Sequence, residues 1–141
     1  SKFGWAGIID VKIKNAKRYG VKVIYDEKDK IDSSTYSNVD YVKLCEAVGI
    51  VMDNAIEASI ETSLEINKVV YINVCSKNGL HIKVINMFDN PVDIDKMFVT
   101  NYSSKKRSSG IGLNYLHELE SSGIYSKVYI IENRFIVNID V

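Results

Sequence analysis

The stretch 44–59 is strongly apolar, yet it holds an Asp-Asn pair at positions 53 and 54. Its apolar residues recur at helical spacing, so the pattern predicts a buried helix that begins after Asp40 and ends near residue 61. Asp40 is the expected N-cap, although Lys43 stands where a capping box would have Glu. An Asn in such a helix needs hydrogen-bond partners once it leaves water. This helix therefore constrains the fold and also marks a candidate site.

Asn54 is expected beside the apolar stripe of this helix rather than within it, because successive residues are rotated by about 100°. Ala47 and Ala58 share its position, and such small neighbours leave space for a ligand. Two interpretations stay open. Asn54 is either a buried amide satisfied by nearby backbone, or a carbonyl oxygen for Mg²⁺, which prefers a few hard oxygen ligands together with substrate phosphates. The predicted stripe consists of Tyr41, Leu44, Cys45, Val48, Val51, Met52 and Ala55.

The rest of the chain alternates between helical and strand patterns. Asn78-Gly79 is a strong signal for a type I′ hairpin, and Gly20 is a good helix stop. The order helix, strand, helix, strand, strand, helix, strand, strand predicts a two-layer α+β sandwich, with three helices on one face of a mixed sheet. The expected helices cover 5–19, 40–61 and 110–121, the strands cover 21–25, 68–75, 80–86, 125–131 and 135–141, and 26–38 is a loop.

Composition limits the function classes. The 141 residues are 46% hydrophobic and 26% charged, which predicts one globular domain with a sizeable core. Eighteen basic residues balance eighteen acidic ones, so nucleic-acid binding is not expected. Cys45 and Cys75 lie in apolar runs without CxxC spacing and are expected to be reduced. Neither a membrane span nor a signal peptide is visible, and we expect a domain of a longer protein.

A second motif is the run Ser109-Gly110-Ile111-Gly112-Leu113. Small residues at the start of a helix let backbone amides approach phosphates closely, and the helix N-terminus favours negative charge. A glycine-rich helix start can also serve steric needs alone, so the motif is weak in isolation. Its occurrence after a helix that contains Asp-Asn-Ala favours a nucleotide pocket.

Lys105, Lys106 and Arg107 stand directly before this motif. Most basic runs are solvated surface, but a cation here is within reach of a γ-phosphate as a charge-assisted donor. Asn86 ends an apolar strand and is either part of an Asx turn or a polar group for the edge of an adenine base. His81 and His117 are expected at the surface, and no Ser-His-Asp arrangement is visible.

Asp53-Asn54-Ala55-Ile56-Glu57-Ala58-Ser59 resembles the N box of the GHKL ATP-binding superfamily, and residues 109–113 resemble its G2 box. More closely, the chain resembles the catalytic ATP-binding domain of sensor histidine kinases of the Agr quorum-sensing receptor type. Asn101-Tyr102-Ser103-Ser104-Lys105, with Arg107, is similar to the lid of that group. Residues 7–16 resemble the end of a dimerisation helix. The resemblance implies a Bergerat-type fold.

The resemblance also implies roles for particular residues. Asn54 would be the Mg²⁺ ligand, Gly110 and Gly112 would be the phosphate-loop glycines, and residues 99–109 would form the ATP lid. Residues 1–19 would be the end of the dimerisation helix and a linker, and 20–141 the catalytic domain. The expected nucleotide-binding residues are Asp53, Asn54, Ala58, Asn86, Asp89, Lys105, Lys106, Arg107, Ser109, Gly110, Ile111, Gly112 and Leu113.

Three positions depart from the broader superfamily. Asn86-Met87-Phe88-Asp89 stands in place of the adenine-binding Asp-x-Gly-x-Gly box, so adenine recognition falls to Asn86, with Asp89 as the alternative. Glu57 stands where many histidine kinases have a basic phosphate ligand. Ile50 stands where hydrolytic relatives have a Glu that serves as general base for water, and isoleucine accepts no proton. The last departure favours transfer to a side chain over ATP hydrolysis.

The sequence thus predicts an Mg-ATP-binding catalytic domain that transfers the γ-phosphate to a histidine upstream of Ser1, in two-component signalling. Neither His81 nor His117 lies on the helix 5–19, so this chain alone is not expected to phosphorylate itself. The implied partners are its own dimerisation domain and a response regulator, in a cytoplasmic part of a homodimeric, membrane-anchored receptor. The alternatives are a GHKL ATPase or clamp, a serine kinase of the anti-sigma type, and a non-catalytic interaction domain with the same fold.

Overall fold

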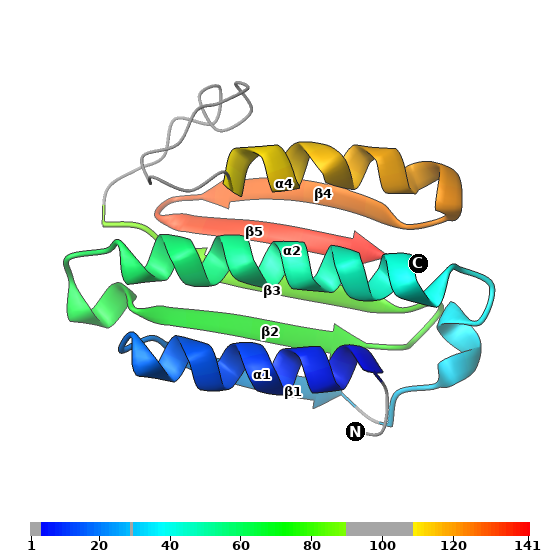
Figure 1. Cartoon of the computed structure of the whole chain (residues 1–141), viewed down its shortest axis with the longest axis horizontal. Helices are drawn as coiled ribbons and strands as arrows, with labels where there is room; N and C mark the ends of the chain where they lie inside the picture. The colour runs from blue at the N-terminus through cyan, green and yellow to red at the C-terminus, as the bar shows by residue number, and fades with distance from the viewer. Residues whose placement is uncertain (1–3, 29, 90–108) are drawn as a thin grey trace.

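A computed structural model describes residues 4–28, 30–89 and 109–141. It has two layers, in which helices cover one face of a five-stranded sheet (Figure 1). The helices are α1 (Gly4–Arg18), α2 (Tyr41–Ile60) and α4 (Ser109–Tyr115), with short 3₁₀ helices at Ser33–Tyr36, Glu65–Asn67 and Leu116–Ser122. The strands are β1 (Lys22–Lys28), β2 (Val69–Cys75), β3 (His81–Met87), β4 (Tyr125–Ile131) and β5 (Arg134–Asp140).

The sheet has the strand order β1-β2-β3-β5-β4. β1 and β2 are parallel, while the other neighbouring pairs are antiparallel. Both hairpins contain residues with positive φ, which are Asn78 (57°) and Gly79 (113°) between β2 and β3 and Glu132 (55°) between β4 and β5. The hairpin expected at Asn78-Gly79 is present, but its loop covers residues 76–80 and is longer than the two-residue loop of a type I′ hairpin. The prediction of a mixed sheet with helices on one face is therefore confirmed.

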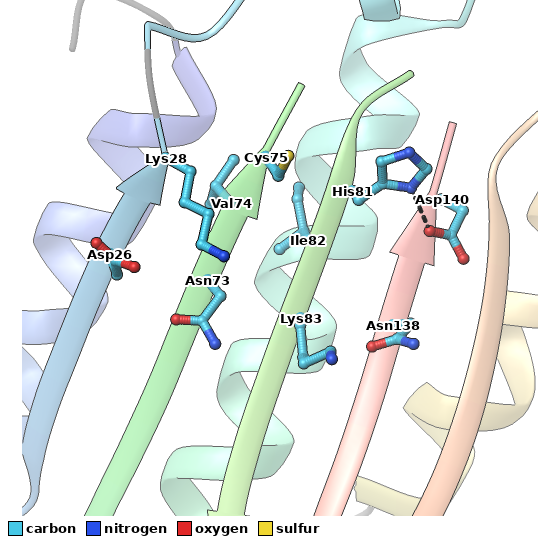
Figure 2. Close-up of a pocket in the computed structure, with 10 residues that line it drawn as sticks. All are labelled: Asp26, Lys28, Asn73, Val74, Cys75, His81, Ile82, Lys83, Asn138 and Asp140. Carbon is cyan, nitrogen blue, oxygen red and sulfur yellow. Dashed lines mark hydrogen bonds and ion pairs between the residues drawn. The ribbon is translucent and has the colours of Figure 1, made fainter. Parts of the chain in front are cut away.

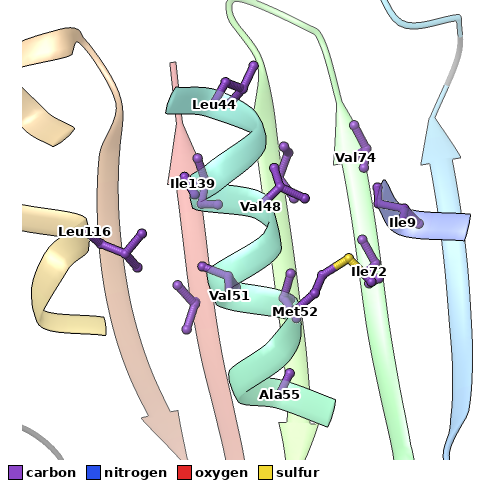
Figure 3. Packing of buried hydrophobic residues seen from close by; sticks show 14 of the residues in the cluster. Ile9, Leu44, Val48, Val51, Met52, Ala55, Ile72, Val74, Leu116 and Ile139 are labelled. Carbon is purple, nitrogen blue, oxygen red and sulfur yellow. The ribbon is translucent and has the colours of Figure 1, made fainter. Parts of the chain in front are cut away.

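The core lies between α2 and the sheet. α2 crosses the middle of the sandwich, and Figure 3 shows its buried side chains above Ile72, Val74 and Ile139. The predicted stripe is confirmed along most of the helix but not in its first turn, where Tyr41 is 38% exposed and Cys45 is half-buried. The buried members of the stripe are Leu44, Val48, Val51, Met52 and Ala55.

α1 is part of the same sandwich. Its residues Ile9 and Ala16 are buried in the common core, and it lies beside α2 over β1 and β2 (Figure 1). Gly20, with a φ of 78°, ends the helix as expected. That residues 1–19 continue a dimerisation helix in a longer chain stays a prediction. Among the described residues, no helix has the length and apolarity needed to cross a bilayer.

Two elements differ from the sequence prediction. β1 extends three residues beyond the predicted end, to Lys28, and the expected loop after it contains a 3₁₀ helix capped by Asp32. α4 ends at Tyr115 and continues as a 3₁₀ helix to Ser122. The reason for the second difference is the leucine spacing. The predicted inward residues Leu113, Leu116 and Leu119 recur every third position, which a 3₁₀ helix keeps on one side, and all three are buried.

Candidate functional site

Asn54 is a buried side chain in the second half of α2. Only 7% of it is exposed, and its Nδ2 donates a hydrogen bond to the carbonyl oxygen of Ile50 at 3.0 Å. This bond runs back along the helix by one turn and fixes the orientation of the carboxamide. Ala47 and Ala58, the small neighbours expected from the sequence, are also buried. Asn54 is therefore an ordered polar group in an otherwise apolar layer.

Gly112 of α4 lies directly against this part of α2. A Cβ added to Gly112 would be 3.1 Å from Cγ2 of Ile50 and 3.5 Å from Nδ2 of Asn54. These separations leave little room for any side chain, because carbon atoms in normal contact are about 3.5–4.0 Å apart. Leu113, the next residue, is buried in the core and anchors the helix. The fold thus brings together the two motifs singled out in the sequence.

Because of the helical period, the residues near the Asp-Asn pair face two different helices, α1 and α4. Ile50 and Asn54, one turn apart, face α4. Asp53 instead faces α1, where its Oδ1 is 2.7 Å from Nζ of Lys12. Asp53 lines a groove of 310 Å³ between α1 and α2, and Glu57, one turn later, lines it as well. The role expected for Asp53 at a nucleotide stays a prediction.

Asn86 lies near the end of β3 and is 1% exposed. Its register partners are Val70 in β2 and Phe135 in β5, two core residues, so its side chain belongs to the helix-covered face of the sheet. Its Nδ2 has no hydrogen-bond partner among the described residues. Figure 1 shows the end of β3 at the same end of the sandwich as the last turns of α2 and the start of α4.

Asp89, the alternative to Asn86 for adenine, accepts several hydrogen bonds from the loop after α2. Its carboxylate accepts from the backbone N–H and hydroxyl of Ser63 at 2.7 and 2.8 Å, from the N–H of Leu64 at 3.3 Å, and from Nδ2 of Asn67 at 2.9 Å. These bonds, that from the Ser63 backbone first, hold the pKa of Asp89 well below its usual range. Asp89 therefore joins two loops at the end of the sheet where Asn86 is buried.

The described residues include only part of the expected site. Lys105, Lys106 and Arg107, and the expected lid up to residue 108, lie outside the described residues. Ser109, Gly110 and Ile111 form the first turn of α4, but only their backbone is described. His81 and His117 are 43% and 64% exposed, which agrees with the expectation that both lie at the surface.

Sequence reasoning missed a hollow of 590 Å³ on the other face of the sheet. Figure 2 shows charged and amide side chains around it, from β1, β2, β3 and β5. Within it, Nδ1 of His81 is 2.6 Å from Oδ1 of Asp140. The signal available in the sequence was the alternation of polar residues along these strands. In the described part of the chain, no group of three or more His, Cys, Asp or Glu side chains is arranged to hold a metal ion.

Comparisons with known proteins agree on the architecture. The sequence profile of the GHKL domain family matches residues 39–141. The catalytic domain of histidine kinase ThkA is 12% identical, with a TM-score of 0.66 over 97% of this chain and 88% of that one. The mycobacterial sensor histidine kinase MprB is 13% identical, with a TM-score of 0.61 over 96% and 92%. Full-length ShkA in complex with AMPPNP is 14% identical, with a TM-score of 0.64 over 95% of this chain and 28% of that one. No curated protein matches the sequence.

Proposed function

The chain belongs to the GHKL domain family, and from this premise we propose that it is the Mg-ATP-binding catalytic domain of a sensor histidine kinase of the Agr receptor type. The catalytic domain of histidine kinase ThkA and the sensor histidine kinase MprB have the same fold as this chain. The AMPPNP in the ShkA complex supports ATP as the ligand. The proposed activity is transfer of the γ-phosphoryl group to a histidine on another segment of the full-length protein.

The observation that carries the proposal is the approach of Gly112 to Asn54. A site for Mg-ATP combines an oxygen ligand for the cation with backbone amides that the phosphates can approach. The 3.5 Å between Asn54 Nδ2 and the Cβ position of Gly112 supports such a site, because it joins two motifs that are distant in sequence. A glycine here lets the backbone of α4 lie close to α2 at Asn54.

The residues of the chain fit a Mg²⁺ ion. Nδ2 of Asn54 is held by the backbone of Ile50, so the atom that would bind a cation is its Oδ1. Mg²⁺ accepts one or two protein oxygens and takes its other ligands from phosphates and water, so a cluster of carboxylates is not required. When bound, the ion would neutralise charge on the transferring phosphoryl group.

The protein would contribute mostly positioning, since phosphoryl transfer needs little covalent chemistry from the enzyme. The acceptor imidazole would attack in line, the bond from the γ-phosphorus to the bridging oxygen would break, and ADP would leave. Ile50 lies against Gly112 and supplies an apolar surface with no general base for water. This side chain favours transfer to the imidazole over hydrolysis.

The larger setting follows from the proposed family group. The acceptor histidine would lie on a dimerisation helix upstream of residue 1, in a homodimer that phosphorylates a response regulator. The chain would be the cytoplasmic part of a membrane-anchored quorum-sensing receptor.

Calorimetry with ATP and Mg²⁺ tests the site. We expect the wild type to bind, and Asn54→Ala to bind at least about tenfold more weakly, because the variant lacks the oxygen that would hold the cation. Asn138→Ala is the matched control, since Asn138 lines the hollow on the opposite face. Absence of binding by the wild type, or equal binding by wild type and Asn54→Ala, would contradict the proposal.

Labelled ATP tests the direction of transfer. We expect no acid-labile phosphate on this chain alone, because His81 is paired with Asp140 on the opposite face and His117 is an exposed residue of the 3₁₀ helix after α4. Robust labelling of either histidine would reject the scheme. Steady-state release of inorganic phosphate would instead favour a GHKL ATPase.

A further inference from the structure

Five polar side chains are buried in the described part of the chain: Asn54, Ser59, Thr62, Asn67 and Asn86. The donors of the first four have partners inside the protein. Ser59 and Thr62 donate to the carbonyl oxygens of Val69 and Ser59. Asn67 donates to Phe88 and Asp89, and Asn54 donates to Ile50. Of these five side chains, Asn86 is the one whose donor, Nδ2, has no hydrogen-bond partner among the described residues.

An unpaired buried amide donor is costly, since it loses its hydrogen bonds to water and gains nothing in return. Native proteins rarely keep such a group unless a ligand or bound water completes it. The surroundings of Asn86 on the sheet are apolar, because its register partners are Val70 and Phe135. A single polar group in apolar surroundings suits a heteroaromatic base whose polar edge meets that group.

We propose that Asn86 is a specificity-determining residue that lets this site accept 6-oxopurine nucleotides as well as adenine nucleotides. The inference rests on the proposed function, and it goes further by naming the class of base. A carboxamide carries both a donor and an acceptor, and a rotation of 180° about its last bond exchanges them.

The two orientations match two different base edges. With Oδ1 toward the substituent at C6, Asn86 accepts from the N6 amine of adenine and its Nδ2 donates to N1. With Nδ2 toward C6, Asn86 donates to O6 of hypoxanthine and its Oδ1 accepts from N1–H. An ionised Asp at this position could only accept hydrogen bonds, so its oxygen would face O6 of hypoxanthine with no hydrogen between the two oxygen atoms. A site whose polar group has no partner on the ligand rejects that ligand strongly. A carboxamide that can pair with either base edge does not reject either base in this way.

ITP is the sharpest probe, because it differs from ATP only in the substituent at C6 and the proton at N1. We expect the wild type to bind Mg-ITP and Mg-ATP with Kd values less than about tenfold apart. Asn86→Asp should be measured at about pH 8, so that the carboxylate is ionised. We expect this substitution to raise the ratio of Kd for ITP to Kd for ATP at least about tenfold. Calorimetry or displacement of a fluorescent ATP analogue gives both constants.

Asn138→Asp is the matched control. Asn138 is also a strand residue with a buried, unpaired carboxamide atom, Oδ1, among the described residues, but it lines the hollow on the opposite face (Figure 2). We expect its ITP-to-ATP ratio to equal that of the wild type. A shift in this control as large as that in Asn86→Asp would overturn the inference, because the effect would not be local.

The remaining outcomes are distinct. If the wild type binds ATP but binds ITP about tenfold or more weakly, the inference fails while the proposed function stands. The same conclusion follows if Asn86→Asp folds, binds ATP and keeps the wild-type ratio. If Asn86→Asp does not fold, the wild-type ratio alone decides. If the wild type binds neither nucleotide, the proposed function fails and the inference with it.

Discussion

Replacing Gly112 by Ala tests the close approach of α4 to α2, on which the site depends. Within a helix, Ala is favoured over Gly by about 1 kcal/mol. At Gly112, however, the new methyl would meet Cγ2 of Ile50 at 3.1 Å. Overpacking of this kind costs about 1–3 kcal/mol, so we expect Gly112→Ala to lower the free energy of unfolding by about 0–2 kcal/mol.

Gly49 in α2 provides a matched control. A Cβ at Gly49 would meet nothing within 4 Å, so Gly49→Ala keeps the gain in helix propensity without the clash. We expect it to raise the free energy of unfolding by about 0.5–1 kcal/mol and the Tm by about 2–4 °C. Thermal and urea unfolding of both variants give the comparison. A rise in Tm for Gly112→Ala equal to that for Gly49→Ala would refute the reasoning.

A second substitution locates the clash. Ile50→Ala removes the Cγ2 atom that the new methyl meets, so its combination with Gly112→Ala should be more stable than the sum of the two single effects predicts. Additive effects would mean that the two side chains do not meet. The same methyl lies 3.5 Å from Nδ2 of Asn54, so Gly112→Ala should also weaken ATP binding, whereas Gly49→Ala should not.

Two further predictions concern charged groups near the site. The pKa of Asp89 is lowered in the folded protein, so the stability that it contributes is present above its ordinary pKa of 3.8 and is lost as the pH falls below that value. The Tm of the wild type should therefore fall more steeply than that of Asp89→Asn between about pH 5 and about pH 2, and parallel curves would contradict this. The pair formed by Lys12 and Asp53 is partly exposed, with side-chain exposures of 26% and 52%, so a double-mutant cycle with Ala should give a coupling below about 1 kcal/mol that shrinks in high salt. A coupling of about 2 kcal/mol or more would show that the pair is not an ordinary surface ion pair.

Local patterns determined the order and type of the elements. Three features act through neighbours that are close along the chain, so their effects are readable from residue spacing. They are the apolar stripe of α2, the Asn78-Gly79 turn, and the leucines at positions 113, 116 and 119. The two motifs of the candidate site were readable in the same way, because the helix that holds Asn54 and the glycines of α4 are local patterns, while their role at a nucleotide stays a prediction. The 3₁₀ continuation after Tyr115 was not predicted, because leucines at every third position suit a 3₁₀ helix but also share one face of an α-helix.

Contacts between distant segments were decided only by the tertiary structure. The sequence places Asp53 and Asn54 side by side, but the packing of α1 on one side and α4 on the other separates their partners, Lys12 and Gly112. The sequence likewise shows an Asn at position 86, while its burial between Val70 and Phe135 comes from strand register. Such contacts depend on how whole helices and strands pack against one another. The free energy of this packing is spread over the many buried side chains of the core, so no single position encodes it.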